Sequence, residues 1–200
     1  MKIKIIFMII VFLFLTACAT KSKLLNTQNF VKDYPNKGFL VGFISVRDTG
    51  RFYDNYEVLI RSDKLSRLVK INIEPKDIEK TQENIGVLKK DGYRGQYFVI
   101  PVMPGDYEIF DFNLTHNTST KDWSDKARNE FSIPLSVVKS QATYVGELYF
   151  DQPSAMEFLS AKRSTNSFLI RDSFRRDVRF FSLHYPSIDW KNIQTVVASK

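Results

Sequence analysis

The stretch YFVIPVMPGDYEIFDFNL, residues 97–114, decides the fold class. It contains an apolar run at 97–102, the dipeptide Pro104-Gly105, and a second run at 106–114 in which aromatic side chains recur. Proline fixes φ at about −65° and glycine accepts a positive φ, so the dipeptide favours a type II turn. Two β-prone runs around a tight turn are typical of a β-hairpin, and the sequence therefore predicts a mainly β domain.

Segments on both sides of this hairpin also have the length and pattern of strands. Residues 39–46 form a continuous apolar run. Alternating patterns predict further strands at 55–61, 68–73, 131–138 and 142–150. Residues 75–90 are charged and irregular, with room for a short helix, and 115–130 are polar and predict a long loop that contains Trp123.

Near the C-terminus the periodicity changes from that of a strand to that of a helix. Apolar side chains spaced four, three and four apart form one helical stripe: Phe174, Val178, Phe181 and Tyr185. Asp172 or Ser173 can cap the first turn and Pro186 stops the helix, so a helix is predicted at about 173–185. The apolar residues between 188 and 197 then form a closing segment expected to pack back on the domain.

The start of the chain carries the clearest functional signal. Lys2 and Lys4 precede an apolar run at 5–15, which ends at the sequence LTAC, residues 15–18. A membrane-spanning helix needs about twenty apolar residues, so this run is too short. A basic start, an apolar core and small residues are in the order of a secretory signal.

The LTAC sequence at 15–18 resembles the lipobox of bacterial lipoproteins. The resemblance implies that residues 1–17 are removed as a signal peptide and that Cys18 is diacylated. Ala19, in place of an aspartate, resembles the outer-membrane pattern of Gram-negative lipoproteins. We therefore expect attachment to the membrane through an N-terminal lipid, on the periplasmic face of the outer membrane. Because Cys18 is the only cysteine, acylation would leave no thiol for a disulfide, a metal site or catalysis.

The domain organisation follows from this signal. After the signal peptide (1–17), residues 18–38 are mostly polar and are expected to form a lipidated, flexible tether. Such a coil of roughly twenty residues would span on the order of 25 Å. Phe30 and Tyr34 are expected to dock its end on a single domain at 39–200.

Two short motifs indicate a more specific fold. The sequences PGDY at 104–107 and YVGEL at 144–148 resemble bacterial envelope proteins that have an immunoglobulin-like or transthyretin-like sandwich. The resemblance covers only part of the chain and implies an antiparallel β-sandwich, here with a C-terminal helix. Many such proteins have Pro-Gly-Lys before the last strand, whereas this chain has KSQ at 139–141.

The sequence contains no recognised catalytic, metal or phosphate motif. His116 and His184, its two histidines, lie outside any nucleophile motif and are interpreted as surface or structural residues. No His-x-His, His-Glu-x-x-His or EF-hand pattern occurs, and Gly92 and Gly95 precede a strand instead of opening a helix. We therefore predict no catalytic residue, cofactor or metal. A pair of carboxylates for glycoside hydrolysis stays open as an alternative, because any two of the 22 acidic side chains could converge in the fold.

Two features are candidate binding surfaces. The first is a basic run at 161–180 that includes Arg171, Arg175, Arg176 and Arg179. Beside a membrane this basic run could bind anionic head groups or an acidic partner. The alternative is that it is simply the solvated face of an amphipathic helix. The second is Trp123, which could stack on a sugar or a protein. Without Lys2 and Lys4 of the signal peptide the net charge falls from +7 to +5, which is only mildly basic and does not indicate a nucleic-acid partner.

These observations favour a non-enzymatic binding or accessory module of the cell envelope, with a protein or an envelope component as its partner. Two alternatives stay open at this point. One is an envelope hydrolase that acts on cell-wall glycan or peptide through carboxylates. The other is a mechanical lipoprotein that spaces an assembly.

Overall fold

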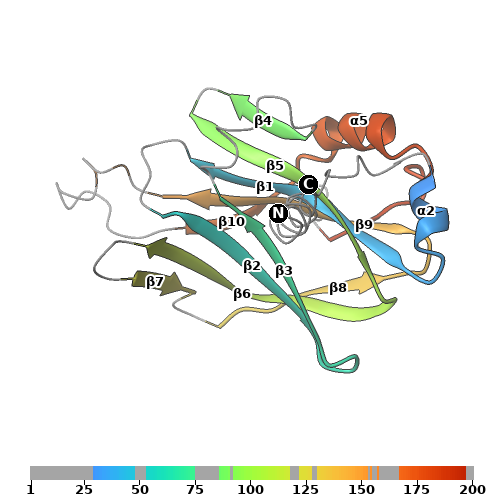
Figure 1. Cartoon of the computed structure of the whole chain (residues 1–200), viewed down its shortest axis with the longest axis horizontal. Helices are drawn as coiled ribbons and strands as arrows, with labels where there is room; N and C mark the ends of the chain where they lie inside the picture. Colours follow the sequence, from blue (N-terminus) through green and yellow to red (C-terminus); the bar gives the residue numbers. More distant parts are fainter. Residues whose placement is uncertain are drawn as a thin grey trace, which may run out of the picture.

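The computed structural model describes residues 29–47, 53–74, 86–90, 92–117, 122–127, 130–152, 154, 157 and 167–196. Within this part of the chain, eleven strands form two sheets that pack face to face, with a helix near the C-terminus (Figure 1). The predicted mainly β class with a C-terminal helix is confirmed. The predicted signal peptide and Cys18 lie outside the described residues.

Sheet A contains both parallel and antiparallel pairs, so the predicted antiparallel arrangement is wrong for this sheet, because a strand's own sequence pattern does not determine the direction of its neighbour. Its order is β10 (Ser167–Arg171), β9 (Ala142–Asp151), β1 (Gly38–Arg47), β5 (Tyr93–Val102) and β4 (Val87–Lys90), and β11 (Gln194–Thr195) also pairs with β9. Strand β1 lies parallel to β9 and antiparallel to β5. The predicted strand at 39–46 is therefore the centre of this sheet.

Sheet B is antiparallel. Its order is β3 (Arg67–Ile73), β2 (Asn55–Ser62), β6 (Gly105–Asn117) and β7 (Asp122–Lys126), and β8 (Ile133–Val137) pairs with β6 beside β7. Strand β2 alternates between buried and half-buried or exposed residues, as its sequence pattern predicts.

The predicted hairpin at 97–114 is wrong. Strand β5 pairs with β1 and β4, whereas β6 pairs with β2, β7 and β8, so Pro104-Gly105 carries the chain from one sheet to the other. Gly105 has a φ of +149°, far from the value of about +80° that a type II turn requires. The hydroxyl of Tyr107 donates a hydrogen bond to the carbonyl oxygen of Met103 at 2.7 Å and braces this corner.

The main core lies between the two sheets. It includes Leu40 and Ile44 from sheet A together with Val58, Ile109 and Leu114 from sheet B, each at most 1% exposed. Strands β1 and β9 are buried on both faces, which explains why the sequence of β1 is a continuous apolar run.

A second core covers the outer face of sheet A. Helices α2 (Phe30–Asp33) and α5 (Phe174–His184) border this face, and Phe30, Phe181 and Ile188 are among its buried side chains. Trp190 stacks on Phe181 with ring centroids 5.2 Å apart. The predicted helix at 173–185 and the packing of the closing segment, as far as residue 196, are thus confirmed.

The segments between the predicted strands need three corrections. Residues 115–117 of β6 pair with residues 122–126 of β7, so these residues are strand and not loop. The prediction missed them because the polar residues of an edge strand show no apolar alternation. Residues 87–90 form strand β4 and not a helix. The packed body also includes residues 29–38 of the predicted tether, where Phe30 is 3% exposed.

The docking of Phe30 and Tyr34 on the domain is confirmed, since both pack in the second core. None of the helices in the described residues is long and apolar enough to cross a membrane.

Candidate functional site

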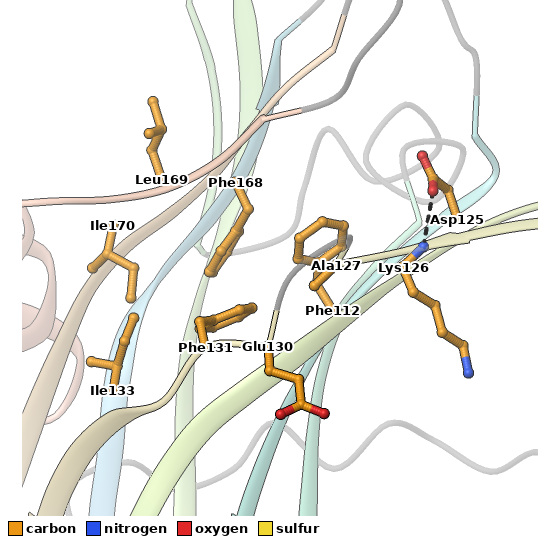
Figure 2. A pocket seen from close by; sticks show the side chains of 10 residues that line it. All are labelled: Phe112, Asp125, Lys126, Ala127, Glu130, Phe131, Ile133, Phe168, Leu169 and Ile170. Carbon is orange, nitrogen blue, oxygen red and sulfur yellow. Dashed lines mark hydrogen bonds between the residues drawn. The ribbon is translucent and has the colours of Figure 1, made fainter.

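A groove of about 490 Å³ opens along one side of the sandwich, between β10 of sheet A and the β7–β8 side of sheet B (Figure 2). Its volume is within the range of about 300–1,000 Å³ that is common for ligand sites. The lining residues are Phe112, Asp125, Lys126, Ala127, Glu130, Phe131, Ile133, Phe168, Leu169 and Ile170.

The groove exists because two short strands share one long neighbour. Strand β8 pairs with residues 105–109 of β6, and β7 pairs with residues 113–117. Residues 110–112 of β6 have no strand partner on this side within the described chain. Further along, the hydroxyl of Thr143 donates to the carbonyl oxygen of Ser136 at 2.8 Å and joins the two sheets there. The sandwich is therefore closed at one end of this side and open beside Phe112.

Aromatic rings form the floor of the groove. The ring centroid of Phe168 lies 5.5 Å from that of Phe112, 6.0 Å from that of Phe131 and 5.1 Å from that of Phe150. Phe112 and Phe150 are buried, whereas Phe131 and Phe168 are half-buried and leave apolar surface open to the groove. An apolar ligand that covered these rings would gain about 25 cal/mol for each Å² of apolar surface removed from water.

Charged side chains lie around this floor and point away from it. Figure 2 shows the carboxylate of Glu130 and the ammonium group of Lys126 directed away from the rings, with Asp125 at the far edge. The lining includes no serine, histidine or cysteine, and the described residues contain no cluster of three or more histidine, cysteine or acidic side chains that could hold a metal ion. An apolar floor with a charged rim is suited to binding.

The strands that flank the groove have open edges. In the described chain β10 pairs only with β9, and β7 and β8 pair only with β6. An edge strand presents alternate N–H and C=O groups outward, and an extended peptide can pair with them. Phe168 and Ile170 pack toward the core, whereas Leu169 is 45% exposed, so β10 offers both an open edge and apolar side chains.

A second polar cluster lies between α5 and the outer face of sheet A. Glu147, which is 4% exposed, accepts hydrogen bonds from the hydroxyls of Ser45 and Ser173, each at 2.7 Å. It also accepts one from Nη1 of Arg176 at 3.2 Å. This glutamate on β9 therefore holds the first turn of α5.

Asp177 is the second carboxylate of this cluster and is completely buried. It accepts hydrogen bonds from the Tyr144 hydroxyl and from Nε of Arg176, both at 2.6 Å. Burial raises the pKa of Asp177, while its hydrogen bonds with Arg176 and Tyr144 lower it and offset part of that rise. Since Arg176 bridges Asp177 and Glu147, the cluster is suited to holding α5 on the sheet.

The four arginines of the predicted basic surface do not act together. Arg175 and Arg179 are exposed on α5. Arg176 turns inward to the carboxylates and lies 4.5 Å above the ring of Phe43. Arg171, at the end of β10, lies 3.4 Å above the ring centroid of Tyr149.

His116 and His184 lie outside the lining of the groove and outside the polar cluster beneath α5. Trp123 lies in β7 opposite His116 of β6, and its side chain is outside the described residues. Nδ1 of His116 is 3.0 Å from a carboxylate oxygen of Asp54. His184 packs its ring on Phe180 at 4.4 Å, as expected for a structural residue.

Comparisons with known proteins give no family. No family model matches the chain, and no curated protein matches it. Among solved structures it is similar to a leucine-rich repeat protein from Bacteroides thetaiotaomicron, with 9% identity and a TM-score of 0.33. That match covers 62% of this chain and 15% of the other, and at this TM-score it supports no conclusion about fold or function.

Proposed function

We propose that this protein is a non-enzymatic binding module of the bacterial cell envelope, held on the membrane by a lipid on Cys18. Its partner is a protein that places an extended, apolar segment in the groove beside β10. The aromatic floor of the groove, centred on Phe168, is the observation that carries the proposal.

The anchor part of the proposal rests on the sequence. The basic start, the apolar run and the LTAC sequence at 15–18 support export, cleavage and acylation. Ala19 supports the periplasmic face of the outer membrane as the location. We also propose that the sandwich is of the immunoglobulin-like or transthyretin-like kind, on the motifs at 104–107 and 144–148.

The choice of an extended peptide rests on the geometry of the groove edge. Successive side chains of a strand point to opposite faces, so a peptide added to β10 would direct every second residue toward the rings. Its backbone would bond to the open edge of β10, and its polar residues would meet the charged rim. Glu147 and Asp177 also come together, but they do not favour the hydrolase alternative because both are buried beneath α5 and bridged by Arg176, away from the groove.

Site-specific photocrosslinking in cells tests this proposal. A benzophenone amino acid replaces Leu169 at the groove or, as the control, Leu68 on β3; these leucines are 45% and 54% exposed. We expect position 169 alone to give a protein adduct, and mass spectrometry to place the crosslink in a segment with alternating apolar residues.

A groove-filling variant completes the experiment. Ala127→Trp adds a large side chain at the lining and should abolish the adduct at position 169 while the circular dichroism spectrum stays unchanged. An equal adduct yield at positions 169 and 68, or a yield that Ala127→Trp leaves intact, would contradict the proposal. Absence of any adduct would favour the mechanical spacer.

A further inference from the structure

The outward face of α5 combines charge with an exposed apolar side chain. Arg175, Arg179 and Leu183 are spaced four residues apart, so they form one stripe along the helix. Both arginines are exposed, and Leu183 is 74% exposed. The opposite side of α5 is fixed to sheet A through Asp177 and Phe181, which are completely buried, and the stripe therefore faces away from the sheet.

This combination is chemically specific. A single exposed leucine is ordinary on a soluble protein, but here it continues a row of guanidinium groups. Amphipathic helices that lie on bilayers place leucine among the head groups, while arginine extends its charge toward anionic phosphate. The stripe provides both parts on a rigid helix.

The N-terminal segment enters the folded body beside this helix. The ring of Phe30 in α2 lies 5.2 Å from that of Tyr185, which directly follows α5. Residues 18–28 span at most roughly 36–40 Å when fully extended. A lipid on Cys18 would therefore keep the α5 side of the domain within that distance of the bilayer.

We propose that the stripe Arg175, Arg179 and Leu183 rests on an anionic bilayer surface, with Leu183 among the head groups. Its proximity to the bilayer rests on the lipid anchor of the proposed function, whereas its preference for anionic lipid rests on the stripe alone. The orientation leaves the partner groove accessible, because β7 lies at the opposite end of the sandwich from α5 (Figure 1).

The test uses the acylated mature chain in vesicles, with one thiol introduced for an environment-sensitive fluorophore. Because Cys18 is the only native cysteine, Leu183→Cys gives a single reactive site, and Leu68→Cys on β3 is the matched control. We expect the label at 183 to shift to the blue and to be quenched by doxyl lipids in phosphatidylglycerol-containing vesicles. It should stay in water on phosphatidylcholine alone, and the label at 68 should stay in water on both.

Charge reversal separates the stripe from general electrostatics. Arg175→Glu with Arg179→Glu should abolish the shift, while Lys64→Glu with Arg67→Glu, an equal charge change on exposed residues in the turn between β2 and β3 and at the start of β3, should preserve it. A label at 183 that responds equally to both lipid compositions, or not at all, overturns the inference. Loss of the shift in the variant with Lys64→Glu and Arg67→Glu overturns it as well.

A chain without the lipid distinguishes failure of the anchor from failure of the stripe. A chain of residues 18–200 that carries Cys18→Ser is the mature chain without the lipid, and its flotation with phosphatidylglycerol vesicles reports the stripe directly. Each arginine near an anionic surface contributes about fivefold, so neutralising Arg175 and Arg179 to glutamine should lower the partition coefficient about thirtyfold. Equal partition coefficients for the unacylated chain with and without the two glutamine substitutions would refute the inference. An unmodified Cys18 in the mass spectrum of the native chain would refute only the anchor.

Discussion

Replacing Tyr144 by phenylalanine removes the hydroxyl that joins strand β9 to helix α5. Tyr144 is completely buried, and its hydroxyl donates to the carboxylate of Asp177 at 2.6 Å. A hydrogen bond to a charged group contributes about 1.5–3 kcal/mol. We therefore expect Tyr144→Phe to lower the free energy of unfolding by about 2 kcal/mol at neutral pH. For a chain of this size, that is a fall in Tm of about 4–8 °C.

The loss should depend on pH in a defined direction. The Tyr144 hydrogen bond lowers the pKa of Asp177 in the folded state, which burial has already raised above its ordinary value of 3.8. Removing the hydroxyl raises that pKa further, while the pKa in the unfolded chain is unchanged. A carboxylic acid with a raised folded-state pKa loses stability as the pH rises. The destabilisation by Tyr144→Phe should therefore be larger at neutral pH than in acid, as Asp177 becomes protonated.

Urea unfolding followed by circular dichroism at neutral and at mildly acidic pH measures both effects. Tyr149→Phe is the matched control, because Tyr149 is on the same strand and 7% exposed, and its hydroxyl has no hydrogen bond in the described chain. We expect the control to stay within about 0.5 kcal/mol of the wild type. A Tyr144→Phe loss as small as the control's, or one that grows in acid, would refute the reasoning.

Three further substitutions test the groove and sheet A by urea unfolding. Phe168→Ala should lower the free energy of unfolding by about 2–3 kcal/mol. This is less than the usual 3–5 kcal/mol for a fully buried phenylalanine, because the ring of Phe168 is half-buried. An unchanged urea midpoint would show that the groove floor is not packed as described. Thr143→Val removes the hydrogen bond that joins the sheets beside the groove and should cost about 1 kcal/mol. Gly95→Ala would place a Cβ 2.5 Å from the carbonyl oxygen of Ile44, so a loss of about 3 kcal/mol is expected, and a neutral result would contradict the β1–β5 register.

Local periodicity predicts the strands and the helix but not their partners. Strand β2 and helix α5 were predictable because one face of each is apolar, at periods of two and 3.6. Both halves of the run at 97–114 form strands, as predicted, yet they belong to different sheets. Val102 and Tyr107 face the same core in either arrangement, so the pattern does not distinguish a hairpin from a crossing between sheets.

The groove was not predictable from the sequence for a similar reason. Phe112, Phe131 and Phe168 come from three separate segments, and each by itself is an ordinary core position of a strand pattern. Their convergence depends on the gap between β7 and β8, which is a property of register along β6.

The orientation of the arginines on α5, by contrast, can be predicted from their spacing along the helix. Arg175 and Arg179 are four residues apart and share a face, whereas Arg176 is turned by about 100° from Arg175, toward the sheet. Counting the arginines as one basic run obscured that separation. The burial of Asp177 could not be predicted from the sequence, since an aspartate beside an arginine is common on solvated helices.

The parallel pairing of β1 with β9 has a consequence for how the chain is made. Phe39 pairs with Ala142, so the central strand of sheet A meets its second neighbour only after roughly a hundred further residues have been synthesised. Contacts between such distant segments form slowly, because the entropy of closing a long loop must be lost first. An emerging chain therefore cannot complete this sheet until most of its length is available. Under the proposed export of this chain, that delay would preserve a state that can still be threaded through a narrow channel.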